Sequence, residues 1–215
     1  MKLRAWLSVS AAAAGALLTG CGAGPVSLAQ GPREYVATDY PSVLDRWTRS
    51  ESLFLFDELT RALTVTATFE SWDFRWAHVV RYAQDYRLTI PQRQALLRER
   101  LEDTEAHHEF FLALYGEEDR QNDLTRSDSA WIVRLIDSTG AEVSPESIES
   151  VSKTGVLERR FYPYSNVWRR AFRVRFPTRL PDGKRSIAPA ATWFGLRFAG
   201  PWGNTDLTWR TRQSR

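Results

Sequence analysis

The segment from 103 to 109, DTEAHHE, holds the best candidates for metal chemistry. Asp103 and His107 are four positions apart and would share one face of a helix. A carboxylate and an imidazole so placed can chelate Zn²⁺ or another divalent ion, with His108 as a further ligand. The sequence has no His-Glu-x-x-His motif, and spacing assigns no further ligand. The alternative is a solvated helix end whose histidine complements the helix dipole.

Other catalytic motifs are missing from the sequence. It has no Gly-x-Ser-x-Gly elbow and no glycine-rich phosphate loop. Nothing in the spacing pairs two acids across a cleft. His78 lies one position off an apolar stripe and is expected to be a boundary residue beside that stripe rather than a base. The sequence therefore favours a protein with no enzymatic activity and no cofactor.

Aromatic residues offer a different chemistry, that of a sugar or peptide platform. Tyr162, Tyr164 and Trp202 fall in predicted loops, which tend to face water, and are candidate ligand-binding residues. Trp193 and Trp209 fall in predicted strands and are expected in the core. Core packing is also the alternative for the three loop aromatics.

Arginines alternate along a predicted strand from 168 to 176. Arg169, Arg173 and Arg175 would share one face, opposite Phe172 and Phe176 among others. This face could dock an acidic partner or lipid head groups. The favoured alternative is a solvated face covered by acids from neighbouring strands.

The N-terminus is the most specific part of the sequence. Lys2 and Arg4 precede an uncharged, alanine-rich run from 5 to 18. At 1.5 Å per residue this run spans roughly 21 Å, too short for a bilayer core of roughly 30 Å, so it is predicted to be a secretory signal. The run ends in Leu18-Thr19-Gly20-Cys21, which resembles the lipobox of bacterial lipoproteins.

The resemblance implies cleavage before Cys21 and a diacylglycerol on its thiol. Two or three acyl chains would hold the protein on a membrane, whereas one chain binds only marginally. Gly22 stands where an aspartate favours inner-membrane retention in enterobacterial lipoproteins, which suggests the outer membrane, with the domain facing the periplasm or the surface. Cys21 is the only cysteine, so no internal disulfide is expected.

Composition narrows the class of protein. The chain has 215 residues, 43% of them hydrophobic and 13% aromatic, which is typical of a soluble globular domain. Without residues 1–20, which carry two basic residues and no acid, the formal charge is 27 − 26 = +1. So small a net charge does not indicate a nucleic-acid-binding surface.

The periodicity predicts one domain. We expect a signal peptide over 1–20, a flexible tether over 21–34, a β-rich domain over 35–210 and a tail over 211–215. A first strand is expected at 43–49, and 62–69 alternates with period two.

A helical hairpin is expected at about 71–106, because apolar residues recur there at helical spacing. Ser71 is its expected N-cap, and Thr89 with Gln92 forms a predicted capping box at the restart. About seven strands around this hairpin predict an antiparallel β-sandwich of immunoglobulin-like architecture. A compact α+β domain is the alternative.

These features together predict a lipid-anchored envelope lipoprotein with a non-catalytic binding or structural domain. Its partners would be membrane lipid, through acylated Cys21, and a protein or glycan of the envelope. The alternatives are a membrane-anchored metal-dependent hydrolase and a carbohydrate-binding module.

Overall fold

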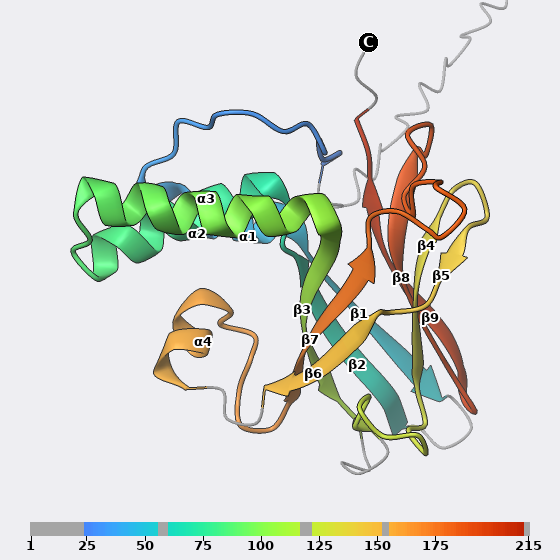
Figure 1. Cartoon of the computed structure of the whole chain (residues 1–215). Coiled ribbons are helices and arrows are strands. Elements are labelled where there is room, and N and C mark those ends of the chain that lie inside the picture. Colours follow the sequence, from blue (N-terminus) through green and yellow to red (C-terminus); the bar gives the residue numbers. More distant parts are fainter. Residues whose placement is uncertain (1–23, 56–59, 117–121, 152–154, 213–215) are drawn as a thin grey trace, which may run out of the picture.

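The computed structural model describes residues 24–55, 60–116, 122–151 and 155–212 (Figure 1). Two antiparallel sheets form the body, and a pair of long helices projects from one end of it. The helices are η1 (Ala37–Asp39), α1 (Tyr40–Trp47), α2 (Trp72–Asp85), α3 (Ile90–Ala106) and α4 (Val156–Phe161). The strands are β1 (Thr48–Leu55), β2 (Thr60–Phe69), β3 (His107–Tyr115), β4 (Ile132–Asp137), β5 (Glu142–Val143), β6 (Ser147–Val151), β7 (Arg170–Pro177), β8 (Trp193–Gly200) and β9 (Gly203–Arg210).

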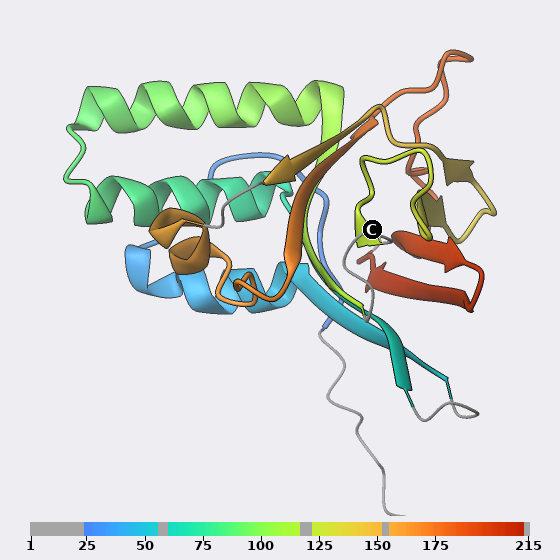
Figure 2. The same ribbon diagram turned by 90° about the horizontal axis from the view of Figure 1, so that it is seen from below.

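Side chains alternate between the two faces of each strand, and the aromatic ones on the inner faces of both sheets form a shared core. The larger sheet has the order β1-β2-β3-β7-β6 and the smaller β5-β4-β8-β9 (Figure 2). Phe69 and Phe110 of the larger sheet meet Phe194 and Trp209 of the smaller, with centroids 5.1 Å apart for Phe69–Phe194 and 5.6 Å for Phe110–Trp209. All four rings are buried. The predicted mainly antiparallel β body with helices is confirmed at this level, and Trp209 lies in the core as expected.

The predicted helical hairpin is also present. It consists of α2 and α3, joined by a turn at 86–89. The Ser71 side chain accepts a hydrogen bond from the Phe74 backbone N–H at 3.1 Å, and the Thr89–Gln92 capping box forms. Both predicted caps are therefore confirmed.

The predicted first strand at 43–49 is wrong for most of its length. Residues 40–47 form α1 instead, with Pro41 in its first turn. Tyr40, Val43, Leu44 and Trp47 are buried, and their spacing is that of one helix face rather than of a strand. β1 then begins at Thr48.

The segment predicted to be a flexible tether lies against the domain from Val26 onward. Val26 is fully buried and bridges to Thr211, with backbone hydrogen bonds from Val26 to Arg210 (2.8 Å) and from Arg212 to Val26 (2.7 Å). Farther along, the Trp72 indole N–H donates to the Gly31 carbonyl at 2.7 Å. The segment then passes over the helices to α1 (Figure 1). No helix in the described ranges is long and apolar enough to cross a membrane.

Candidate functional site

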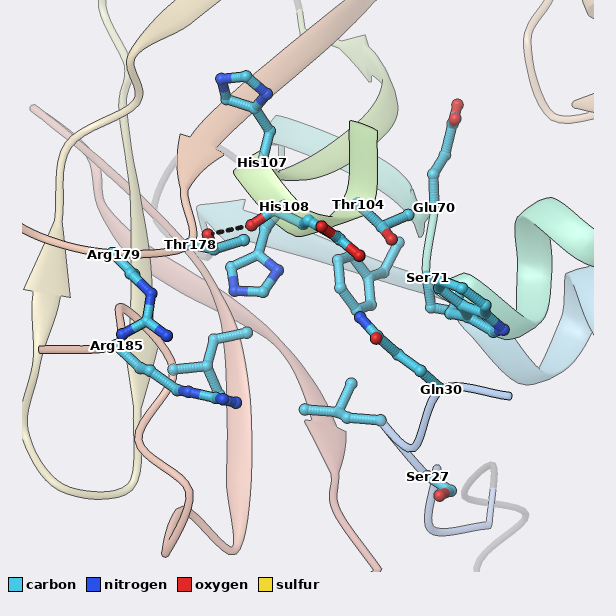
Figure 3. A pocket seen from close by; sticks show the side chains of 15 residues that line it. Ser27, Gln30, Glu70, Ser71, Thr104, His107, His108, Thr178, Arg179 and Arg185 are labelled. Atoms are coloured by element: carbon cyan, nitrogen blue, oxygen red, sulfur yellow. Dashed lines mark hydrogen bonds between the residues drawn. The ribbon is translucent and has the colours of Figure 1, made fainter. Parts of the chain in front are cut away.

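A cavity of about 410 Å³ lies where the N-terminal segment meets the end of the larger sheet (Figure 3). We call it the N-terminal cavity. Four segments line it: the N-terminal segment, the β2–α2 junction, the α3–β3 junction and the loop after β7. The lining residues are Ser27, Leu28, Gln30, Phe69, Glu70, Ser71, Trp72, Thr104, Glu105, His107, His108, Thr178, Arg179, Arg185 and Ile187.

His108 is the imidazole that reaches into this cavity. It is the second residue of β3, so alternation sends its side chain to the opposite face from that of His107 (Figure 3). Its ring lies edge-on to Phe69, with centroids 5.8 Å apart, and makes no hydrogen bond within the described residues. Burial, with Arg185 and His107 nearby, lowers the pKa of His108 to about 4. The imidazole is therefore neutral near pH 7 and can accept a proton or a hydrogen bond.

Two arginines stand side by side on the wall opposite the N-terminal segment. Arg179 and Arg185 pair across a small antiparallel bridge, closed by a turn with Gly183 at φ 82°. The acid of this turn, Asp182, pairs with Lys184 at 3.0 Å instead. Neither arginine forms an ion pair with any residue that the structure describes.

The predicted metal site does not come together. Asp103 Oδ1 and His107 Nδ1 lie 3.3 Å apart, as the helical spacing requires, and His107 Nε2 lies 3.3 Å from Glu146 Oε2. His108 faces the other side of β3, and Asp103 Oδ2 accepts from Arg75 Nη1 at 2.8 Å. Within the described ranges, no three His, Cys, Asp or Glu side chains are placed to hold a metal ion. The side chain of His107 therefore lies on one face of β3, next to Asp103, and that of His108 lies on the other.

The predicted arginine face carries a buried network of charges rather than a solvated surface. Glu109 accepts from Arg173 (2.9 Å), Arg175 (3.1 Å) and Arg75 (3.1 Å), while Glu70 accepts from Arg173 at 3.0 Å. The side chains of Glu70, Glu109 and Arg75 are at most 6% exposed. Cross-strand acids do cover Arg173 and Arg175, as the favoured alternative stated.

Glu70 stays ionised inside this network. Burial alone would raise its pKa, but Arg173, Arg75 and the Tyr162 hydroxyl outweigh burial and lower it. The other arginine of the predicted face, Arg169, donates to Thr66 Oγ1 at 2.9 Å. These partners are internal, which leaves this face little capacity for an external acid.

Of the two predicted loop tyrosines, Tyr162 is buried and Tyr164 is partly buried. Tyr162 is 3% exposed, stacks on Phe111 with centroids 3.9 Å apart, and donates to Glu70 Oε1 at 2.6 Å. The Tyr164 hydroxyl bonds to Thr68 Oγ1 at 2.7 Å. The loop after α4 folds back onto the outer face of the larger sheet, which is why these loop residues do not face water. Trp202 is 40% exposed beside Trp131.

The Tyr162 hydroxyl gives a direct test of the network. Tyr162→Phe should lower the free energy of unfolding by about 1–2 kcal/mol, because buried Glu70 loses a donor. Urea unfolding followed by tryptophan fluorescence measures the change. Tyr115→Phe, at an exposed tyrosine, is the matched control and should stay within about 0.5 kcal/mol of the parent. Equal losses for both variants would contradict a role of the hydroxyl in the network.

A smaller cavity of about 160 Å³ lies between α2, α3 and α4. Its lining includes the rings of His78, Tyr82, Phe161 and Tyr162 together with aliphatic and charged residues. The guanidinium of Arg173, a partly buried residue of the lining, is already paired with Glu70 and Glu109. The ring centroid of His78 lies 4.4 Å from that of Phe161, and the residue is partly buried.

The residues that give the N-terminal cavity its positive charge and its polar wall were not identified from the sequence. Arg179 and Arg185 flank the turn signal Pro181-Asp182-Gly183-Lys184, so a tight turn could have predicted that they face each other. Gln30 and Ser27 lay in the predicted tether and carried no signal. Chemically, the cavity combines two guanidiniums that no described residue pairs, a neutral imidazole and uncharged hydrogen-bonding groups, which suits an anionic ligand.

Comparisons with known proteins assign neither a family nor a function to the chain. No protein family and no curated protein sequence matches the chain. Among solved structures, a novel protein of unknown function from Burkholderia pseudomallei is similar over 79% of this chain and 80% of that one. Their sequence identity is 14% and the TM-score is 0.41, which is too low to support an argument about function.

Proposed function

We propose that this protein is a lipid-anchored, non-catalytic binding module of the bacterial cell envelope, held to the outer membrane through acylated Cys21. Its ligand site is the N-terminal cavity. The body would be a sandwich of immunoglobulin-like architecture with the α2–α3 pair inserted between β2 and β3. The aromatic rings packed between the two sheets support this arrangement.

One observation carries the proposal: the segment that follows the lipobox is a wall of the cavity. Val26 is fixed to the end of β9, only five residues after Cys21, and Ser27, Leu28 and Gln30 line the cavity directly beyond it. Five extended residues reach at most about 18 Å. An acylated Cys21 would therefore keep the cavity close to the lipid surface.

The alternatives have less geometric support. A metal-dependent hydrolase would need a third ligand near Asp103 and His107, and His108 points to the opposite face. A carbohydrate platform would need exposed rings, whereas Tyr162 and Tyr164 have internal hydrogen bonds. Trp202 remains accessible, but it would act without them.

The anchor is tested by Cys21→Ala in the full-length protein. We expect the variant to lose metabolic labelling with a fatty-acid analogue, to remain uncleaved and to be poorly retained in the membrane fraction, because the thiol is the attachment atom. Ser27→Ala, which leaves the lipobox intact, is the matched control and should label like the parent. Undiminished labelling of Cys21→Ala would contradict the proposal.

A further inference from the structure

We propose that the N-terminal cavity binds the phosphate group of an anionic membrane lipid through Arg179 and Arg185. The location of this ligand rests on the proposed function, because the anchor brings the cavity to the lipid surface. The chemistry of the site rests on the side chains alone.

The arrangement of the two arginines is the first argument. Residues opposite each other on antiparallel strands have Cβ atoms roughly 5 Å apart, and like charges there repel. Arg179 and Arg185 occupy such positions, and within the described part of the chain no carboxylate pairs with either. A guanidinium fork matches phosphate oxygens, and two forks compensate their repulsion by sharing one anion.

The charges around this pair favour an anion. Two acids, Glu70 and Glu105, line the cavity together with the arginines. Glu70 turns away from the cavity, toward Arg173 and Tyr162 (Figure 3). Glu105 is exposed at the rim of the α3–β3 junction. Two cations therefore face one exposed acid.

The rest of the lining fits a head group larger than a phosphate ion. About 410 Å³ lies within the usual range of small-molecule sites, roughly 300–1,000 Å³. Gln30, Ser27 and Thr104 offer uncharged donors and acceptors that suit glycerol hydroxyls. His108, partly buried and without a hydrogen-bond partner in the described residues, points into the same space and can bond to a phosphate or a hydroxyl.

The position of the cavity selects a lipid over a soluble phosphate. Ser27, Leu28 and Gln30 form one wall, and they begin six residues after Cys21. A head group in the bilayer that holds the acyl chains is thus present at high effective concentration next to the cavity.

The test is native mass spectrometry of the mature protein, expressed from the full-length sequence and processed by the cell, in a non-ionic detergent, with phosphatidylglycerol, phosphatidylcholine or inorganic phosphate added separately. We expect one phosphatidylglycerol to be retained, and phosphatidylcholine to be retained at least roughly tenfold more weakly, because its choline cancels the anionic charge. Arg179→Gln with Arg185→Gln should weaken phosphatidylglycerol retention by roughly tenfold or more.

The matched control also removes two positive charges. Arg61→Gln with Arg159→Gln changes exposed residues on β2 and α4; Arg61 lies at the opposite end of β2 from the cavity, and neither forms an ion pair within the described residues. It should bind phosphatidylglycerol like the parent. Equal weakening by both double variants, or no retained lipid, would overturn the proposal. Binding of inorganic phosphate without phosphatidylglycerol would overturn the lipid source.

The same spectrum separates this proposal from the anchor. Acyl chains on Cys21 add covalent mass to the protein, whereas a head-group ligand dissociates on activation. Covalent acylation without a retained lipid would contradict only the proposal that the cavity binds a lipid head group. A retained lipid on an unacylated chain would contradict the anchor and, with it, the argument that the anchor brings the cavity to the lipid surface.

Discussion

Glu109→Gln should lower the free energy of unfolding by about 3 kcal/mol, a large part of the 5–15 kcal/mol typical of a domain. The carboxylate accepts from Arg75, Arg173 and Arg175, and an amide brings no charge and one oxygen fewer. Arg75, only 3% exposed, would keep Asp103 and more distant Glu70 as partners. This residual pairing puts the loss at the low end of the 3–5 kcal/mol expected when a buried ion pair is broken. Urea unfolding of the two proteins measures it.

Glu142→Gln provides the control for that measurement. Glu142 also pairs with an arginine, Arg197, at 2.6 Å, but the two side chains are 51% and 34% exposed. Exposed pairs contribute roughly 0–1 kcal/mol, so this variant should unfold close to the parent. A Glu109→Gln protein as stable as Glu142→Gln would show that the buried network does not hold the helices to the sheet.

That network explains why β3 is buried on both faces. Phe110, Leu112 and Leu114 face the core, while Glu109 and Phe111 lie beneath Arg75 of α2 and Tyr162 after α4. A sheet face covered by helices need not be apolar, provided that each charge has a partner. Here, the acids come from β3 and from the residue directly after β2, and the arginines come from α2 and β7.

Local signals explain what the sequence could predict. The alternation at 62–69 yields β2, and helical spacing with the Ser71 and Thr89 caps yields α2 and α3. These signals work because each depends on neighbours fewer than five residues away. Where a segment carried two patterns, as at 43–49, the helix prevailed because Val43, Leu44 and Trp47 are buried together.

The candidate site depends on contacts that no local pattern encodes. The Tyr162 hydroxyl meets Glu70 across 92 positions, and Arg173 meets Glu70 across 103. Likewise, the N-terminal cavity joins residue 27 to residue 187. Asp103 and His107 did meet, since four residues on a helix are neighbours, but adjacent positions on β3 sent His107 and His108 apart.

Two histidines should make the protein less stable as the solution is acidified from about pH 6.5 to about pH 5. The pKa of His78 is lowered from 6.5 to about 4, mainly by burial; Glu70 opposes this shift, and Arg100, Arg173 and Arg75 each add a smaller lowering effect. The pKa of His108 is lowered to about 4 by burial, Arg185 and His107. The unfolded chain therefore binds protons that the folded protein does not. Stability from these groups is complete above about pH 6.5 and falls as the pH approaches 4.

The loss should reach about 2 kcal/mol for each histidine by about pH 5. Acids with lowered pKa values, such as buried Glu70 and partly exposed Asp103, lose their contribution mainly below this interval, since their ordinary values are 4.5 and 3.8. Urea unfolding at a series of pH values, in buffers without phosphate, therefore isolates the imidazoles.

Substitution by phenylalanine assigns the pH dependence to its residues. His78→Phe keeps a ring against Phe161, and His108→Phe keeps a ring against Phe69. One substitution should remove about half of the slope between about pH 6.5 and 5, and both together most of it. A flat profile in the parent would contradict neutral histidines in the folded state. A profile that both substitutions leave unchanged would assign the slope to other groups, because only a group whose proton uptake differs between the two states can produce it.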